Sequence, residues 1–433
     1  MIKYKLSNNE FINLTFLIFY STIIIGFLYN EDSLGGAKGD YLYHLAISNN
    51  FSSNFFNTWD GFGYGETGLQ TRNSPVFWII ISLLNKFLSH DLIRILNTSS
   101  SLLIAIFFFK CLCLKFKKID KKTLSLIACS VIFLSPTIRS LAIWPYSLIW
   151  GLLLFIISIY NYLLFEQKKD YKKKTISSFY SIFYLALSSY IYPSFAVFSI
   201  FYLIQFLKFL KFSKNFIIVL FLNFLVSVHA LYFLFTKGFY FFGAQGIAVS
   251  ASTSFNISNK IIIISSLLLY FLIPILDIKD TYKNFKKKIN FKSLFLLILL
   301  TFAIIIFFDY PYISSGGFGG GFFHKVSNIV FGNNLLLYLS FFVFLNIYFF
   351  FFQNNLKNYL LFFTLILFNL QFTIYNKYFD PLLLILLFFV FDFKLEKHIF
   401  KNKNQLIKLF SILFIYLLMG LFKSNIFTTI NAP

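Results

Sequence analysis

Charged residues are scarce in this chain: they make up 12% of its 433 residues, and only 16 residues are acidic. A water-soluble globule of this size needs a mostly polar shell, so this scarcity excludes a soluble domain. Apolar residues make up 58% of the chain, and the mean hydropathy is +0.75. Since a helix crosses a bilayer with about 20 apolar residues, the sequence predicts a polytopic membrane protein.

The chain also lacks two other patterns. Its apolar runs, such as residues 294–308, do not alternate with polar residues, which excludes a transmembrane β-barrel. Its three cysteines, Cys111, Cys113 and Cys129, are too few and too apolar in setting for a disulfide framework or a metal site. We therefore expect packing roles for the cysteines, no metal ligands and no resident cofactor.

The apolar segments predict an all-α, polytopic transmembrane helix bundle of about 13 spans. The first span follows a short start that bears Lys and lacks a clear cleavage site, so we expect it to be retained. The expected spans are 11–29, 92–114, 123–136, 146–165, 175–192, 194–210, 216–236, 260–277, 293–308, 335–352, 359–374, 381–393 and 405–422.

The basic residues predict the orientation of these spans. With the N-terminus inside, 28 of the 38 Lys and Arg residues fall on the inner side and ten on the outer side. The net charge of +22 therefore reflects membrane topology rather than a nucleic-acid partner. Residues 74–88 would invert the later loops if they crossed the membrane, so we expect a helix on the outer surface there.

These expectations organise the chain as one integral membrane domain, residues 1–433. It divides into a first outer loop with juxtamembrane helices (30–91), the helices of an N-terminal catalytic module (92–236), and C-terminal helices with outer loops (237–433). Further outer loops are expected at 137–145, 237–259, 309–334 and 375–380. The carboxylates of the outer loops lie among aromatic residues and glycines, whereas the inner carboxylates are interleaved with Lys. Chemistry is therefore expected on the outer face.

The first outer loop carries the most informative residues. Asp40 precedes His44 by four residues, a spacing that projects both side chains from one face of a short helix. A carboxylate near the positive end of that helix stays ionised and can accept a proton. The alternative is that Asp40 only caps the helix, a common role for Asp.

This loop resembles the multi-spanning C-type glycosyltransferase superfamily. The resemblance rests on Asp40-Tyr41 followed by His44, on the Pro-started apolar helix at 73–78, and on the segments 135–140 and 144–146. It covers about the first 165 residues. It implies a first helix that starts inside, a large outer loop with surface helices, and a catalytic carboxylate early in that loop.

The resemblance implies transfer of a sugar from a polyprenyl-phosphate carrier to a lipid, glycan or protein acceptor. The reaction would occur at the outer face of a bacterial inner membrane, with inversion at the sugar. Asp40 is then the expected base. Substrate contacts are expected from other residues of the loop, namely His44, Asp60, Glu66 and Arg72.

Three later segments are candidates for binding the phosphate or the sugar. Arg139 offers a fork of donors suited to phosphate oxygens, although an interfacial Arg can also simply extend toward water. His324 and Lys325 follow five glycines, which indicate either a ligand-binding turn or a flexible linker. The third segment is either part of the site or a simple turn, and its candidates are Lys377, Tyr378 and Asp380. We expect Arg139, His324 and Lys377 to converge on one anionic site.

Two other classes of protein fit parts of the sequence. A transporter or lipid flippase would place ionisable residues within its spans, and the expected spans hold almost no carboxylates away from their ends. A polysaccharide polymerase or O-antigen ligase would share the substrate class, but we expect its large outer loop late in the chain. Here the largest expected loop is the first.

The charge distribution gives a prediction of topology. A reporter that is active only in the cytoplasm should be silent when fused after Pro433, because 13 spans place the C-terminus outside. The same reporter fused after Lys169, within an expected inner Lys cluster, is the positive control. A strong cytoplasmic signal from the Pro433 fusion would contradict an odd number of spans.

Overall fold

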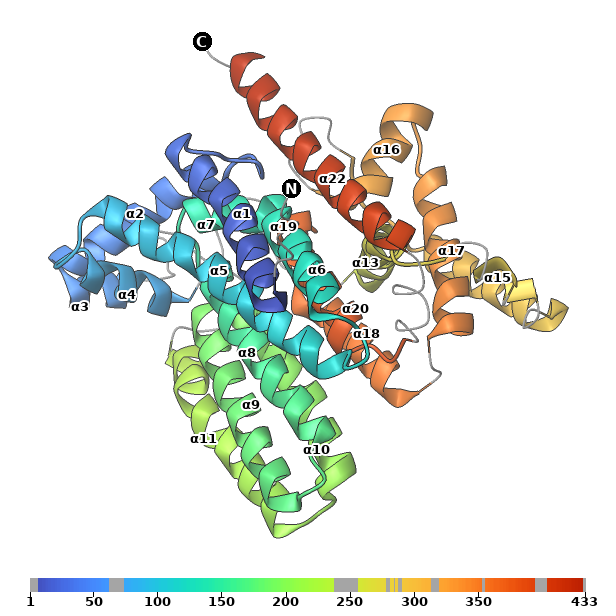
Figure 1. The fold of residues 1–433 in the computed structure, drawn as a ribbon, viewed down its shortest axis with the longest axis horizontal. Helices are drawn as coiled ribbons and strands as arrows, with labels where there is room; N and C mark the ends of the chain where they lie inside the picture. Colours follow the sequence, from blue (N-terminus) through green and yellow to red (C-terminus); the bar gives the residue numbers. More distant parts are fainter. Residues whose placement is uncertain are drawn as a thin grey trace. The chain divides into compact units, whose positions relative to one another are not determined.

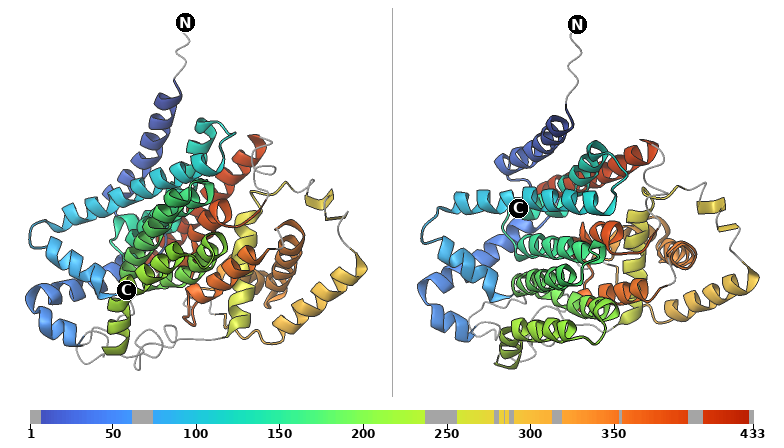
Figure 2. Two further views of the ribbon diagram at one scale, coloured as in Figure 1. Left: turned by 90° about the horizontal axis from the view of Figure 1, so that it is seen from below. Right: turned by 60° about the horizontal axis from the view of Figure 1, so that its bottom comes forward.

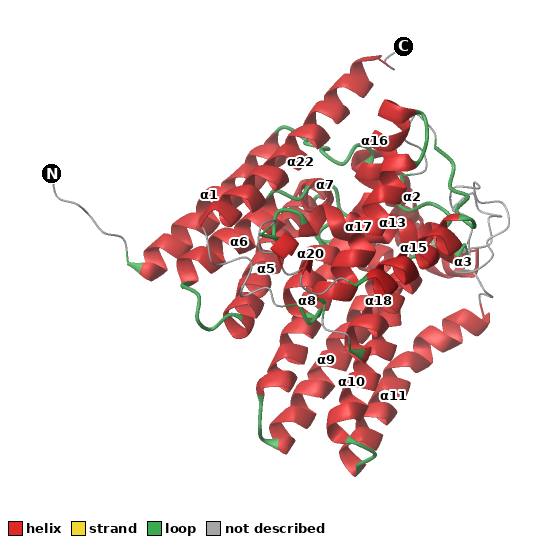
Figure 3. Ribbon diagram, turned by 90° about the vertical axis from the view of Figure 1, so that its right-hand side faces the viewer, coloured by secondary structure: helices red, strands yellow, loops and turns green. Residues whose placement is uncertain are grey.

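The computed structural model describes residues 7–61, 74–236, 256–277, 281–283, 285–286, 290–312, 319–352, 355–393 and 403–430. Within these ranges the chain is helical, and the only β-type pairings are isolated bridges (Figure 3). The chain divides into two compact units. Unit 1 comprises Met1–Tyr240 and Phe410–Pro433, and unit 2 comprises Phe241–Leu409.

Unit 1 holds the first helices and most of the last one (Figure 1). They are α1 (Asn8–Leu28), α2 (Ala37–Ser53), α3 (Phe55–Gly61), α4 (Pro75–Leu84), α5 (His90–Lys115), α6 (Lys121–Phe133), α7 (Pro136–Ile143), α8 (Ser147–Gln167), α9 (Tyr171–Ile191), the 3-10 turn η1 (Pro193–Val197), α10 (Phe198–Leu210), α11 (Lys214–Thr236) and α22 (Lys403–Ile430).

Unit 2 is built from shorter helices. They are α13 (Ile257–Leu272), α15 (Phe291–Ile305), α16 (Gly321–Phe331), α17 (Leu335–Phe351), α18 (Leu356–Phe368), α19 (Asn376–Phe379) and α20 (Leu382–Phe389). An apolar cluster joins α13, α15 and α17 through Ile262, Leu297 and Phe341. Each of the 13 apolar segments expected from the sequence overlaps a described helix.

Among the described residues, fewer than 13 helices are both long and apolar enough to cross a bilayer. In the described part of the chain, five helical segments are long and apolar enough: α1, α5, α8, the η1–α10 segment and Asn404–Phe422 of α22. The pair α6 and α7, bent by 65° at their junction, would be a sixth. The chain is therefore a helical membrane protein, but 13 spans are not confirmed.

Helix α20 shows why hydropathy alone does not establish the number of spans. Its eight residues correspond to a length of about 12 Å, far less than a bilayer core. All eight side chains, Leu382 to Phe389, are buried inside the protein. A helix that is surrounded by protein is as apolar as one surrounded by lipid, so composition does not separate the two.

The segment expected as the first outer loop, residues 30–91, contains short helices: α2 lies beside α3 and α4 (blue in Figure 2). Helix α4 has ten residues, about 15 Å, so it is too short to cross the membrane, as expected for residues 74–88. Ser74 caps its first turn and Pro75 begins it. A hydrogen bond between Ser52 and Ser82 joins α2 to α4.

Residues 136–143, within the segment where an outer loop is expected at 137–145, form helix α7. All of its residues are buried. The local cause is the Ser135-Pro136 pair: Pro136 interrupts the helix before it, and the Ser135 hydroxyl accepts the N–H of Ile138 to begin a new one. This restart produces the bend between α6 and α7.

Small residues bring α8 and α9 close together, the packing mode that membrane helices favour. The hydroxyls of Ser158 and Ser181 each donate to the main-chain carbonyl of the other residue, at 2.6 and 3.1 Å. The Ser188 hydroxyl donates to the carbonyl of Gly151 at 2.7 Å. Helices α8, α9, α10 and α11 together form one bundle of unit 1 (Figure 1).

Candidate functional site

The start of α2 is capped by Asp32. Its carboxylate accepts four consecutive main-chain N–H groups, from residues 35–38, at 2.9–3.2 Å. Gly35 and Gly36 have φ of 74° and 113°, which turns these N–H groups toward one point. The main-chain N–H groups at the start of α2 are therefore bound by Asp32.

Asp40 lies in the first turn of α2 and is partly exposed. His44 lies one turn later on the same helix, as the spacing predicts, and it is buried. Its ring stacks on Trp78 of α4 with centroids 4.5 Å apart and planes 12° apart. His44 therefore joins α2 to α4, and a role in binding substrate stays a prediction.

The other candidates of the first loop lie farther along the chain. Asp60 is exposed in the last turn of α3. Glu66 and Arg72 lie outside the described residues.

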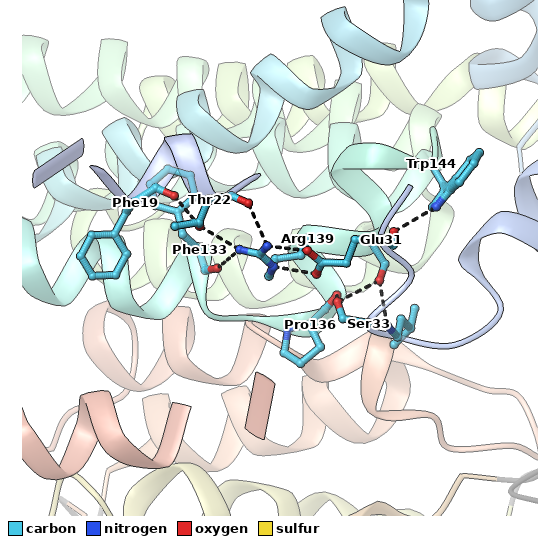
Figure 4. Close-up of polar contacts among 10 residues, drawn as sticks. Phe19, Thr22, Glu31, Ser33, Phe133, Pro136, Arg139 and Trp144 are labelled. Atoms are coloured by element: carbon cyan, nitrogen blue, oxygen red, sulfur yellow. Dashed lines mark hydrogen bonds and ion pairs between the residues drawn. The ribbon is translucent and has the colours of Figure 1, made fainter. Parts of the chain in front are cut away.

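Arg139 of α7 forms a buried ion pair with Glu31, just after α1 (Figure 4). The side chains of Arg139 and Glu31 are 7% and 8% exposed. The guanidinium binds the carboxylate with two hydrogen bonds, Nε to Oε1 at 2.7 Å and Nη2 to Oε2 at 2.5 Å. Its other N–H groups donate to the Thr22 hydroxyl (2.9 Å), the Thr22 carbonyl (3.0 Å) and the Phe133 carbonyl (3.3 Å). All five donors of the guanidinium are thus engaged.

The residues next to Glu31 are also bound to α7 and its C-terminal cap. The Trp144 indole N–H donates to the Glu31 carbonyl at 3.1 Å. The main-chain N–H of Leu34 donates to the Ser140 hydroxyl at 2.7 Å, and the Ser33 hydroxyl donates to the Pro136 carbonyl at 3.2 Å (Figure 4). The connection between α1 and α2 therefore lies fixed against α7.

Arg94 of α5 is a second buried arginine that the sequence analysis did not single out. Its guanidinium lies over the Trp144 ring at 4.2 Å and over the Phe27 ring at 4.8 Å. It donates to the Asn30 side chain at 2.8 Å and to the Ile143 carbonyl at 3.2 Å. The signal that could have identified it is the rarity of Arg, since only three of 38 basic residues are Arg.

In unit 2 the structure brings together the two late segments expected to share a site. The main-chain N–H of Gly320 donates to the Ile374 carbonyl at 3.0 Å, and the N–H of Ile374 donates to the Tyr310 hydroxyl at 2.9 Å. Gly319, Gly320 and Gly321 all have positive φ, between 82° and 86°. A Cβ on Gly319 would lie 2.4 Å from the Ile374 carbonyl oxygen, so this close approach needs glycine. Residues 319–321 are therefore an ordered turn rather than a linker.

His324 is buried beside this turn, with 1% of its surface exposed. The rings of Tyr310 and Tyr312 lie 5.5 and 5.8 Å from its ring. Neither ring nitrogen has a hydrogen-bond partner among the described residues. Burial, with a smaller effect of the neighbouring Lys325 charge, lowers the pKa of His324 to about 4. The imidazole is therefore neutral at pH 7, so it can offer one donor and one acceptor but no charge.

The segment that faces this turn, residues 371–380, contributes both neutral and charged polar groups. The Asn376 side-chain oxygen is buried without a hydrogen-bond partner in the described part of unit 2. The Lys377 ammonium lies 5.5 Å from the Tyr375 ring centroid and 5.8 Å from that of Tyr378. The Tyr378 hydroxyl donates to the Gln371 side chain at 3.0 Å, and Asp380 is 3% exposed. This arrangement combines neutral hydrogen-bonding groups, aromatic rings and a cation.

The candidates therefore form two groups. Asp40, His44 and Arg139 belong to unit 1, whereas His324, Lys325 and Lys377 belong to unit 2. The convergence of Arg139 with His324 and Lys377 stays a prediction. Among the described residues, no three His, Cys, Asp or Glu side chains are grouped to hold a metal ion.

These features define a helical membrane protein in which buried polar networks fix the ends of the helices. Comparisons with protein-family models, with curated proteins and with solved structures give no match to this chain.

The burial of His324 predicts a pH dependence of stability. A His with a pKa of about 4 in the folded protein and an ordinary value of 6.5 when unfolded binds its proton more tightly in the unfolded chain. Its contribution to stability is therefore complete above pH 6.5 and is lost as the pH falls toward 4. The Tm of the detergent-purified protein should fall between pH 6.5 and 4.5, and His324→Phe should reduce this fall. Equal pH slopes in both proteins would contradict the prediction.

Proposed function

We propose that this protein is a membrane glycosyltransferase. It moves a sugar from a polyprenyl-phosphate donor to an acceptor hydroxyl at the outer face of a bacterial inner membrane. The observation that supports this most is the start of α2: Asp32 caps the helix, and Asp40 lies in its first turn. A carboxylate in that position, early in the first outer loop, is what the resemblance to C-type glycosyltransferases implies.

In the proposed reaction Asp40 takes the proton of the acceptor hydroxyl. The acceptor oxygen attacks the anomeric carbon from the face opposite the phosphate, and the bond between that carbon and the phosphate oxygen breaks. The configuration at the sugar is therefore inverted, and the polyprenyl phosphate leaves with the bonding electrons.

We assign binding of the donor to the two late segments of unit 2. Lys325 and Lys377 supply the positive charge that the leaving phosphate needs. His324 is neutral at pH 7, so its role is a hydrogen bond to a sugar hydroxyl rather than an ion pair with phosphate. The aromatic rings beside it, Tyr310 and Tyr312, suit the apolar face of a sugar.

The proposal includes the orientation expected from the basic residues, with the N-terminus in the cytoplasm and the active face outside. The order of 13 crossings is also part of it, and the fusion after Pro433 decides whether their number is odd.

The described ion pairs support an enzyme over a transporter. Glu31 lies just after α1, and Lys357 and Asp392, 3.1 Å apart, lie at the start of α18 and just after α20, whereas Arg139 lies within the eight-residue helix α7. A transport path needs such groups in the middle of its spans. A polysaccharide polymerase or O-antigen ligase stays an alternative that differs in the acceptor.

The proposed base gives a direct test. Asp40→Asn keeps the shape of the side chain but cannot take a proton, so transfer should fall by about 100-fold or more. Mass spectrometry of envelope glycans from cells with and without this gene identifies the product, and its rate of formation is then compared between variants.

The matched control is Glu10→Gln, which removes an exposed carboxylate in the first turn of α1 and leaves an amide oxygen that can still accept the Ser7 N–H. It should leave the rate near that of the unaltered protein. Normal product formation in Asp40→Asn, at equal expression, would show that Asp40 is not the base.

A further inference from the structure

Both arginines in the described part of the chain hold the connection between α1 and α2. Arg94 donates to Asn30, and Arg139 pairs with Glu31, the next residue. They reach the connection from different helices, α5 and α7. A short connection held by two buried guanidinium groups is strongly constrained.

The geometry of Arg139 argues against direct binding of a substrate phosphate. Its five N–H groups are already engaged by Glu31, Thr22 and Phe133. A phosphate would have to displace at least one of them and would leave a carboxylate buried without its partner. The absence of a side chain on Gly26 also fits the pair, because a Cβ there would lie 2.4 Å from the Glu31 carboxylate.

The contacts lead in sequence from α7 to Asp40. Glu31 binds Arg139, Asp32 caps α2, and Ser33 and Leu34 bind α7 through hydrogen bonds. Four consecutive residues thus join α7 to the first turn of α2, which carries Asp40. A change in how the connection rests on α7 would therefore shift the start of α2.

We propose that α7 is a latch for the α1–α2 connection and that Arg139 is a positioning residue, not a phosphate ligand. Arg139 sets the place of α2 through Glu31. On the proposed function, which this step assumes, it thereby sets the place of the base Asp40.

A disulfide between the α1–α2 connection and α7 can hold the connection in place when the Arg139–Glu31 pair is removed. The hydroxyl oxygens of Ser33 and Ser140 lie 3.2 Å apart, so cysteines at both positions can form a bond between the connection and α7. The test starts from a variant in which Cys111, Cys113 and Cys129 are replaced by Ala. Into it are introduced Arg139→Gln alone, or Arg139→Gln with Ser33→Cys and Ser140→Cys oxidised by copper phenanthroline.

The first readout is independent of any enzymatic activity. Gly39→Cys places a thiol next to Asp40 at a site where an added Cβ meets nothing within 4 Å, and it is spin-labelled after the oxidation step. The label should become more mobile in Arg139→Gln. Its spectrum should return when the disulfide forms and be lost again on reduction.

The second readout is sugar transfer in the same variants without the Gly39→Cys change. Arg139→Gln should lower kcat at least tenfold with little change in KM for the donor, and the disulfide should restore it. A disulfide cannot replace a phosphate ligand. If the disulfide returns the label spectrum to that of the unaltered protein but kcat stays low, the positioning role is overturned. An unchanged label spectrum in Arg139→Gln would overturn the latch itself.

Two further outcomes are informative. If the label responds as expected but the unaltered protein transfers no sugar, the latch stands and the glycosyltransferase proposal fails. If Arg139→Gln does not accumulate, Arg139→Lys takes its place, because it keeps the charge but loses the two parallel hydrogen bonds to Glu31. If the Ser33→Cys and Ser140→Cys disulfide restores the accumulation of the Arg139→Gln protein, the latch is supported. If it does not, the latch is contradicted.

Discussion

The ion pair of Arg139 with Glu31 determines much of the structure of unit 1. Two charges removed from water are costly unless each is fully satisfied, and here the guanidinium has five hydrogen bonds and the carboxylate has two. Loss of one partner from such a pair costs about 3–5 kcal/mol, because the other charge stays buried. The pair can form only where α1 ends, where α6 gives way to α7, and where the first loop begins. It therefore fixes these three features together.

The positions of the described helices follow the apolar segments of the sequence, but only five or six of these helices are long and apolar enough to cross a membrane. Hydropathy located α20 correctly, but the helix is apolar because protein surrounds it. The same measure did not identify α7, since its eight residues include Arg139 and, apart from Pro136, were expected to lie in a loop. The length of a helix and its surroundings depend on tertiary packing, and no local pattern records them.

The candidate site was foreseen in part. The spacing of Asp40 and His44 predicted one helix, which the structure has. The glycines before His324 predicted a turn close to a ligand; residues 319 and 320 lie against Ile374, and a ligand stays a prediction. The roles of Asp32 and Glu31 were missed because both look like ordinary loop carboxylates in the sequence. Their partners, the start of α2 and Arg139, are identified only by the fold. The neutral state of His324 at pH 7 could not be predicted from the sequence, because it depends on burial, which lowers the pKa.

Helix α22 adds a constraint on the order of assembly. Its Gly420 lies against the carbonyl of Ser33, so closely that a Cβ would be 2.5 Å from that oxygen. The ribosome makes Ser33 long before Gly420. The α1–α2 connection therefore stays uncovered on this side while the chain between them is made, and unit 1 is complete only when α22 packs against it. A chain released before that point would present an unfinished surface to the machinery that degrades misassembled membrane proteins.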